Sequence, residues 1–142
     1  DHLTRTNRIY LEPLAKAAER GRVTGRLRRG ELRPNLLGRW FIGEIEPPPK
    51  RRFKAPLPAM VPPSDGAKDS ILADFRRVQA SVTAAVQASA DLDLRRIRFH
   101  NPLLRGWRVF NLATGFLVIC AHERRHLAQA GAVRARPDFP AR

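Results

Sequence analysis

The chain has 142 residues, a length typical of a single domain that can bury a hydrophobic core without disulfide bonds. Its one cysteine, Cys120, excludes an intramolecular disulfide bond and fits a reducing cytoplasm, and no apolar run is long enough to span a membrane as a helix. The net charge of +14 raises nucleic-acid binding, but 23 of the 27 basic residues are Arg and they are scattered as pairs. We therefore interpret them as solvated surface and keep nucleic-acid binding as the weaker alternative.

The first predicted element is a helix over residues 1–20. Leu3, Tyr10, Leu14 and Ala17 recur at helical spacing and form one apolar stripe. The sequence starts at Asp1, without Met, inside this amphipathic pattern. We therefore expect the N-terminus to be missing, by a segment on the order of one helix.

Residues 21–63 are predicted to be a long loop that contains one short helix. Five of the glycines lie here, and seven of the twelve prolines lie between Pro47 and Pro63, whereas residues 35–45 carry a helical apolar pattern. We expect that short helix to plug one end of a bundle. A crossing connection of this length is typical of bundles in which consecutive helices are not joined by hairpins.

Two further helices are predicted, over residues 64–91 and 103–130. Ser64 or Asp65 could cap the first, and Pro102 and Gly131 mark the start and end of the second. Cys120, Trp40 and Trp107 are expected in the core or at a bundle end. The only weak strand pattern covers residues 97–99, so the chain is predicted to be one all-α domain over residues 1–142.

The last predicted helix carries the residues that point to chemistry. One of its faces begins apolar and then turns polar. The residues of this face are Leu112, Gly115, Ile119, His122, His126, Gln129 and Val133. Two imidazoles one helical turn apart can converge on one metal ion, and burying them without a partner costs free energy. The alternative is that both histidines only form hydrogen bonds or face solvent.

Residues 122–126 also match H-E-x-x-H, the string of zinc peptidases in which Glu acts as general base. Such peptidases take a third ligand after the motif, but no His follows His126, and Asp138 is the only acidic side chain there. No convincing sheet precedes the motif to present a substrate. A zincin-type peptidase is therefore the weakest interpretation.

The pattern of residues 100–137 resembles the C-terminal helix of the DinB/YfiT-like superfamily, which tends to show H-x-x-x-H followed by Gln. Here these residues are His122, His126 and Gln129, and Glu123 follows the first His, as it often does in that superfamily. The start of the chain is similar to the family's second helix, through Asp1, His2, Leu3, Asn7, Tyr10 and Leu11. The resemblance implies a DinB-like four-helix bundle, here without its first helix, with a long Pro- and Gly-rich crossing loop.

The resemblance also implies a metal site. His2, His122 and His126 would be the ligands of a divalent ion, with nickel or zinc the usual occupants and water in the open positions. Gln129, Glu123 and Tyr10 would orient a ligand or contact substrate, although Glu123 could face solvent and Tyr10 could be core.

The implied function is that of a bacterial, cytoplasmic, metal-dependent protein, such as a thiol-dependent S-transferase or a hydrolase. Its substrate would be a small molecule or a low-molecular-weight thiol, and its partner a second copy in a homodimer. The competing hypothesis is a metal-free helical scaffold or binding protein.

Overall fold

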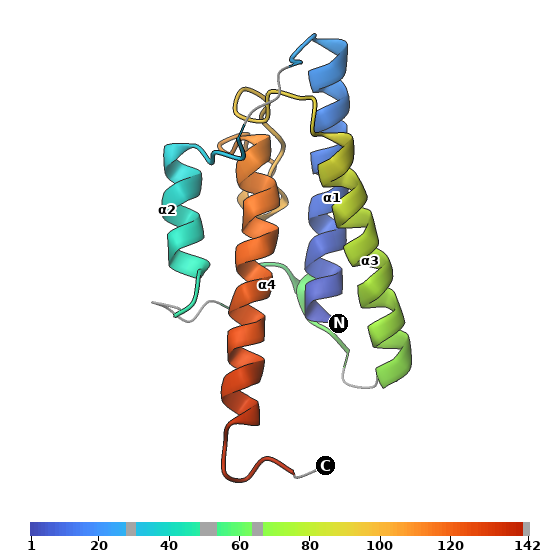
Figure 1. The fold of residues 1–142 in the computed structure, drawn as a ribbon, viewed down its shortest axis with the longest axis vertical. Helices are drawn as coiled ribbons and strands as arrows, with labels where there is room; N and C mark the ends of the chain where they lie inside the picture. The colour runs from blue at the N-terminus through green and yellow to red at the C-terminus, as the bar shows by residue number, and fades with distance from the viewer. Residues whose placement is uncertain (28–30, 49–53, 64–66, 141–142) are drawn as a thin grey trace.

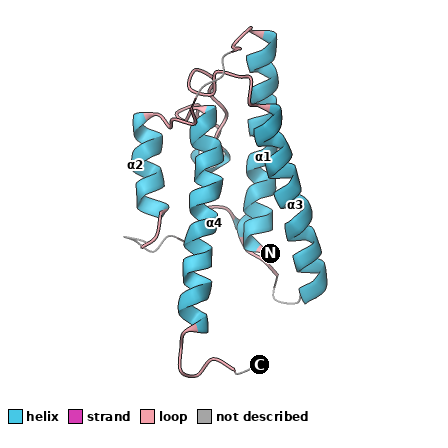
Figure 2. Ribbon diagram, viewed as in Figure 1, coloured by secondary structure: helices cyan, strands magenta, loops and turns pink. Residues whose placement is uncertain are grey.

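A computed structural model describes residues 1–27, 31–48, 54–63 and 67–140. Its helices are α1 (His2–Val23), α2 (Leu36–Ile45), α3 (Lys68–Ala88) and α4 (Leu112–Arg134), with two 3₁₀ helices, η1 (Pro58–Met60) and η2 (Pro102–Leu104). Helices and loops are all that Figure 2 shows, and the described residues contain two isolated β-bridges but no strand. The all-α class and the bundle of four helices are confirmed.

The helices pack in the order α2, α4, α1, α3 across the molecule (Figure 1). In that view α1 and α3 run upward, whereas α2 and α4 run downward. The start of α1 therefore lies beside the C-terminal half of α4. This arrangement brings the two ends of the sequence together.

The long segment between α2 and α3 crosses from one side of the molecule to the other. It carries η1, which packs against α1. The link between these helices is therefore the crossing connection that the sequence predicted. The helix at residues 36–45 was expected at a bundle end, but it lies alongside α4 instead.

The core lies where α1 and α4 meet the loop before α4. Tyr10, Leu14, Phe99, Leu112 and Ile119 are each at most 2% exposed. α3 contributes less, since Val78 and Val82 are its buried residues. The predicted apolar faces of these helices are the faces that pack.

The start of α4 was predicted wrongly. The sequence indicated a helix from residue 103, but only the single turn η2 forms there, ending at Leu104, and α4 begins at Leu112. Arg105 and Gly106 adopt positive φ angles of 52° and 80°, which interrupt a right-handed helix. Asn111 then caps α4, because its side chain accepts a hydrogen bond from the Thr114 backbone N–H.

Other boundaries shift less. α1 runs through Pro13 and past Gly21, and the chain turns at Gly25, whose φ is +65°. α3 covers the middle of the predicted range 64–91, and the proposed caps Ser64 and Asp65 lie outside the described residues. α4 continues to Arg134, past the predicted stop at Gly131.

Three residues expected in the core lie on the surface. Trp40 and Trp107 are 60% and 70% exposed, and Cys120 is also exposed. On α4, Cys120 is adjacent to the buried Ile119, but one position corresponds to about 100° around the helix, which turns the thiol outward. None of the helices in the described ranges has both the length and the apolar character that crossing a bilayer requires.

Candidate metal centre

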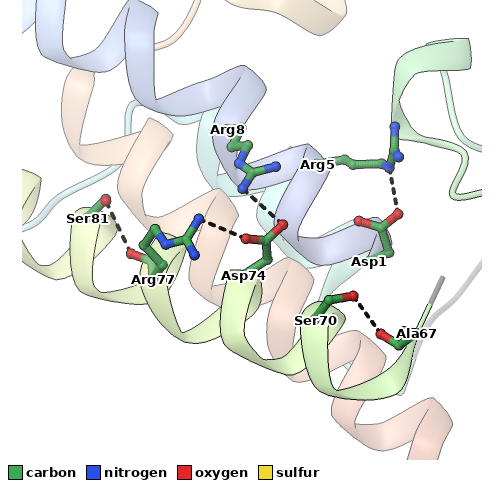
Figure 3. Close-up of polar contacts among 8 residues, drawn as sticks. All are labelled: Asp1, Arg5, Arg8, Ala67, Ser70, Asp74, Arg77 and Ser81. Atoms are coloured by element: carbon green, nitrogen blue, oxygen red, sulfur yellow. Dashed lines mark hydrogen bonds and ion pairs between the residues drawn. The ribbon is translucent and has the colours of Figure 1, made fainter.

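His2 lies in the first turn of α1, where several contacts hold the helix start in place. Figure 3 shows Arg5 paired with Asp1 at 2.8 Å, and Arg8 of α1 paired with Asp74 of α3 at 3.4 Å. In the same view Arg77 also contacts Asp74, at 2.9 Å. Surface ion pairs of this kind each contribute little free energy, and of these three only the pair between Arg8 and Asp74 joins α1 to α3.

The backbone of η1 sets the orientation of the His2 ring. His2 Nδ1 lies 2.7 Å from the carbonyl oxygen of Met60. Because a carbonyl oxygen can only accept, Nδ1 carries the proton and donates it. The lone pair of the neutral ring is therefore on Nε2, the nitrogen that points away from Met60.

His122 and His126 are one turn apart on α4 and both are half-buried. They continue the face on which Leu112, Gly115 and Ile119 are buried. Farther along the same face, Gln129 and Val133 are exposed, because α4 extends past the start of α1. The polar half of this face thus crosses from the interior to the surface at the two histidines.

The three imidazoles converge. His122 Nε2 lies 3.3 Å from His2 Nε2 and 3.1 Å from His126 Nε2. All three candidate ligand atoms lie within 4.8 Å of one another. Nitrogens bound at about 2.0–2.1 Å to one tetrahedral ion would be separated by roughly 3.3 Å. The two separations from His122 Nε2 therefore match those expected around a shared divalent ion.

The surroundings favour the neutral form of the two imidazoles on α4. Burial, together with His126, His2 and Arg125, lowers the pKa of His122 to about 4. Burial also lowers the pKa of His126, with His2 and Arg125 acting in the same direction and Gln129 opposing them. A neutral imidazole is the form that binds metal, so these rings are ready to bind at neutral pH.

The contacts of the outer ring nitrogens differ among the three histidines. His2 Nδ1 is bonded to Met60, and His126 interacts with Gln129, which lies one turn farther along α4. His122 Nδ1 is buried and has no hydrogen-bond partner among the described residues. A histidine that binds metal through one ring nitrogen usually donates the N–H of the other to a hydrogen-bond acceptor. His122 lacks such an acceptor among the described residues, so its ring orientation is the least constrained of the three.

Glu123 neither faces open solvent nor joins the three histidines. Its Oε1 accepts a hydrogen bond from Asn7 Nδ2 at 2.7 Å and another from Gln79 Nε2. Asn7 is fully buried on α1, and Gln79 is half-buried on α3. Glu123 therefore links three helices beside the histidines.

Tyr10 lies in the core. It is 1% exposed, and its ring packs against Phe99 with the centroids 6.1 Å apart. His100 is not part of the cluster: its Nδ1 lies 2.9 Å from the Gly106 carbonyl oxygen, in the turn after η2.

Met60 and Gln79 were missed by the sequence analysis, and Asn7 was noted there only as part of the family resemblance. A backbone carbonyl such as that of Met60 leaves no trace in a sequence pattern. Asn7 did leave one, because it continues the α1 stripe at a spacing of three and four, followed by Tyr10 and Leu14. A polar side chain at a core position of the stripe indicates a buried hydrogen-bond partner, and this signal could have identified Asn7.

Comparison with known proteins identifies one family. The model of the DinB superfamily matches residues 1–130, a range that includes His2, His122 and His126. No curated protein and no solved structure shows significant similarity to the chain.

Proposed function

The chain belongs to the DinB superfamily, and we propose that it is a divalent-metal protein in which His2, His122 and His126 hold the ion. The convergence of three half-buried imidazole nitrogens from opposite ends of the chain supports this most directly. Nickel or zinc suits an all-imidazole ligand set.

The ligand set determines which further ligand the site favours. Three neutral imidazoles leave the double charge of the ion uncompensated. An anionic group, such as a thiolate or hydroxide, would therefore be preferred. When bound, a divalent ion with open positions supplies a Lewis acid that lowers the pKa of a coordinated water or thiol.

We propose a thiol-dependent S-transferase as the activity, with metal-dependent hydrolysis as the alternative. In either reaction His2, held by the Met60 carbonyl, orients one ligand nitrogen, while Gln129 at the exposed edge contacts the incoming substrate. A low-molecular-weight thiol in the bacterial cytoplasm is the proposed substrate. The homodimer remains a prediction, which sedimentation of the purified protein tests.

The contacts of Glu123 argue against a zincin-type peptidase. In that class the Glu of H-E-x-x-H serves as general base, but here its Oε1 is engaged by Asn7 and Gln79. The third histidine, His2, comes from the start of the chain and not from beyond the motif.

The decisive measurement is the metal content of protein purified without a histidine tag. We expect one nickel or zinc ion per chain, and loss of that ion in His122→Ala and in His126→Ala. His100→Ala is the matched control, because His100 makes a surface turn contact, and it should keep the ion. Absence of metal from the wild-type protein, even after incubation with nickel and zinc salts, would favour the metal-free scaffold.

A further inference from the structure

A second polar cluster lies next to the three histidines. Asn7, Gln79 and Glu123 come from α1, α3 and α4 and meet at one carboxylate oxygen, Oε1 of Glu123. Asn7 is fully buried, while the other two side chains are half-buried. Side-chain hydrogen bonds thus connect all three helices through this one cluster.

Such a cluster restricts how the helices can slide past one another. Apolar side chains pack in several registers, whereas a buried amide that loses its acceptor remains unsatisfied and destabilises the shifted state. A carboxylate that accepts from two amides makes stronger, charge-assisted bonds. Buried polar contacts of this kind are known to fix the register of packed helices.

The position of the cluster ties this restriction to the histidines. Glu123 directly follows His122 on α4, and Asn7 lies five residues after His2 on α1. The bond between Asn7 and Glu123 and the approach of His2 to His122 therefore span the same pair of helices. An axial shift of α1 along α4 would break both contacts.

We propose that Glu123 is a positioning residue, which through Asn7 and Gln79 fixes the register of α1 against α4 and so holds His2 opposite His122. The consequence for metal affinity rests on the proposed function. The effect of Glu123 on the placement of His2 is independent of the proposed function, because the contacts that produce it are present in the metal-free protein.

The first experiment is therefore performed on metal-free protein. NMR measures the nuclear Overhauser effect between the His2 and His122 ring protons, whose centroids lie 5.1 Å apart. We expect this signal to be lost in Asn7→Asp, which places two carboxylates face to face, and in Glu123→Ala. Glu12→Gln on the exposed side of α1 is the control and should keep it. A signal of wild-type intensity in Asn7→Asp and Glu123→Ala would overturn the proposal, whether or not the protein binds metal.

A rescue variant separates positioning from general destabilisation. In the double variant Asn7→Asp with Glu123→Gln, the new amide nitrogen at 123 takes the place of the shared oxygen. It can donate one proton to the new carboxylate at 7 and the other to Gln79, whose amide group flips to present its oxygen. We expect the ring-proton signal to return. Failure of the double variant to restore it, while its circular dichroism and melting remain those of a folded protein, would contradict the proposal.

The second experiment measures cobalt(II) binding from its absorption spectrum. Loss of an orienting partner typically weakens metal binding by about 10–100-fold, so we expect that decrease in Asn7→Asp and recovery in the double variant. A wild-type protein that binds no cobalt would refute the metal site, and the NMR result would still decide the positioning role. Equal affinity in wild type and Asn7→Asp would refute the positioning role alone.

Discussion

The side chain of Tyr10 buries an ionisable phenol. Its hydroxyl oxygen is inaccessible and unpaired among the described residues. Burial raises its pKa well above the usual value, and the nearby Asn101 side chain opposes this only in part. The folded state therefore tolerates only the neutral phenol.

Stability should consequently fall at high pH in a way that depends on Tyr10. Because the folded pKa is raised, its contribution is complete below the unfolded pKa of about 10 and is lost as pH rises above it, by about 1.4 kcal/mol per pH unit. We expect wild type to lose about 1 to 1.5 kcal/mol more than Tyr10→Phe between roughly pH 9 and 11. Urea unfolding followed by circular dichroism measures this, and parallel losses in both proteins would disprove it.

The residues that bear donor atoms were predictable, and the groups that orient them were mostly not. His122 and His126 follow from helical spacing, and the family resemblance added His2. The Met60 carbonyl was not predictable, because any residue supplies a carbonyl and only the path of the crossing segment decides where it lies. Gln79 looked like an ordinary surface residue of a helix until α3 was placed against α1.

At the scale of whole elements, the contact between α1 and α4 depends on a residue without a side chain. A Cβ atom at Gly115 would lie 2.4 Å from Leu14 Cδ2 and 2.9 Å from Phe99 Cε1. These distances are shorter than non-bonded atoms tolerate. Gly115 thus sets how closely the two helices that carry the histidines approach.

Gly115→Ala should therefore destabilise the fold by about 1–3 kcal/mol through overpacking. The matched control lies on the same helix, since a Cβ atom at Gly131 meets nothing within 4 Å. Gly131→Ala should instead stabilise by up to about 1 kcal/mol, because alanine has the higher helix propensity. Chemical denaturation of both variants tests the pair, and effects of the same sign would contradict it.

Helices were predicted correctly where an apolar repeat extended over several turns. The prediction failed where a local turn set the position at which a helix begins. α1 follows from the stripe formed by Leu3, Tyr10, Leu14 and Ala17. The late start of α4 depends on Asn111, whose side chain accepts from Thr114 and donates to the Arg33 carbonyl at 3.1 Å. Propensity alone could not reveal that a capped turn outweighs the helix signal at Pro102.

For the molecule as a whole, composition and pattern indicated an all-α bundle with a crossing connection, but not which helices become neighbours. The order α2, α4, α1, α3 arises from pairwise packing between elements far apart in the sequence. The family resemblance supplied the expectation that both chain ends meet at one site.

Metal should then stabilise the entire fold and not only one end of it. An ion bound to the native state alone adds about 4 kcal/mol at a free concentration 1,000 times its Kd. We expect thermal unfolding of wild type to shift upward by several degrees with zinc relative to EDTA, and His126→Ala to show no shift. Identical midpoints for wild type in zinc and in EDTA would argue against the triad as a binding site.

The separation of 120 residues between His2 and His122 has a consequence for the order of events during synthesis on the ribosome. A nascent chain carries its first histidine long before the other two have been synthesised. Before α4 has been synthesised, His2 is the only one of the three histidines in the chain. After α4 emerges, His122 and His126 form a pair one turn apart, but the third ligand joins them only when α4 docks against α1. The complete site of the proposed function can therefore form only late, after α4 has been synthesised and has docked against α1.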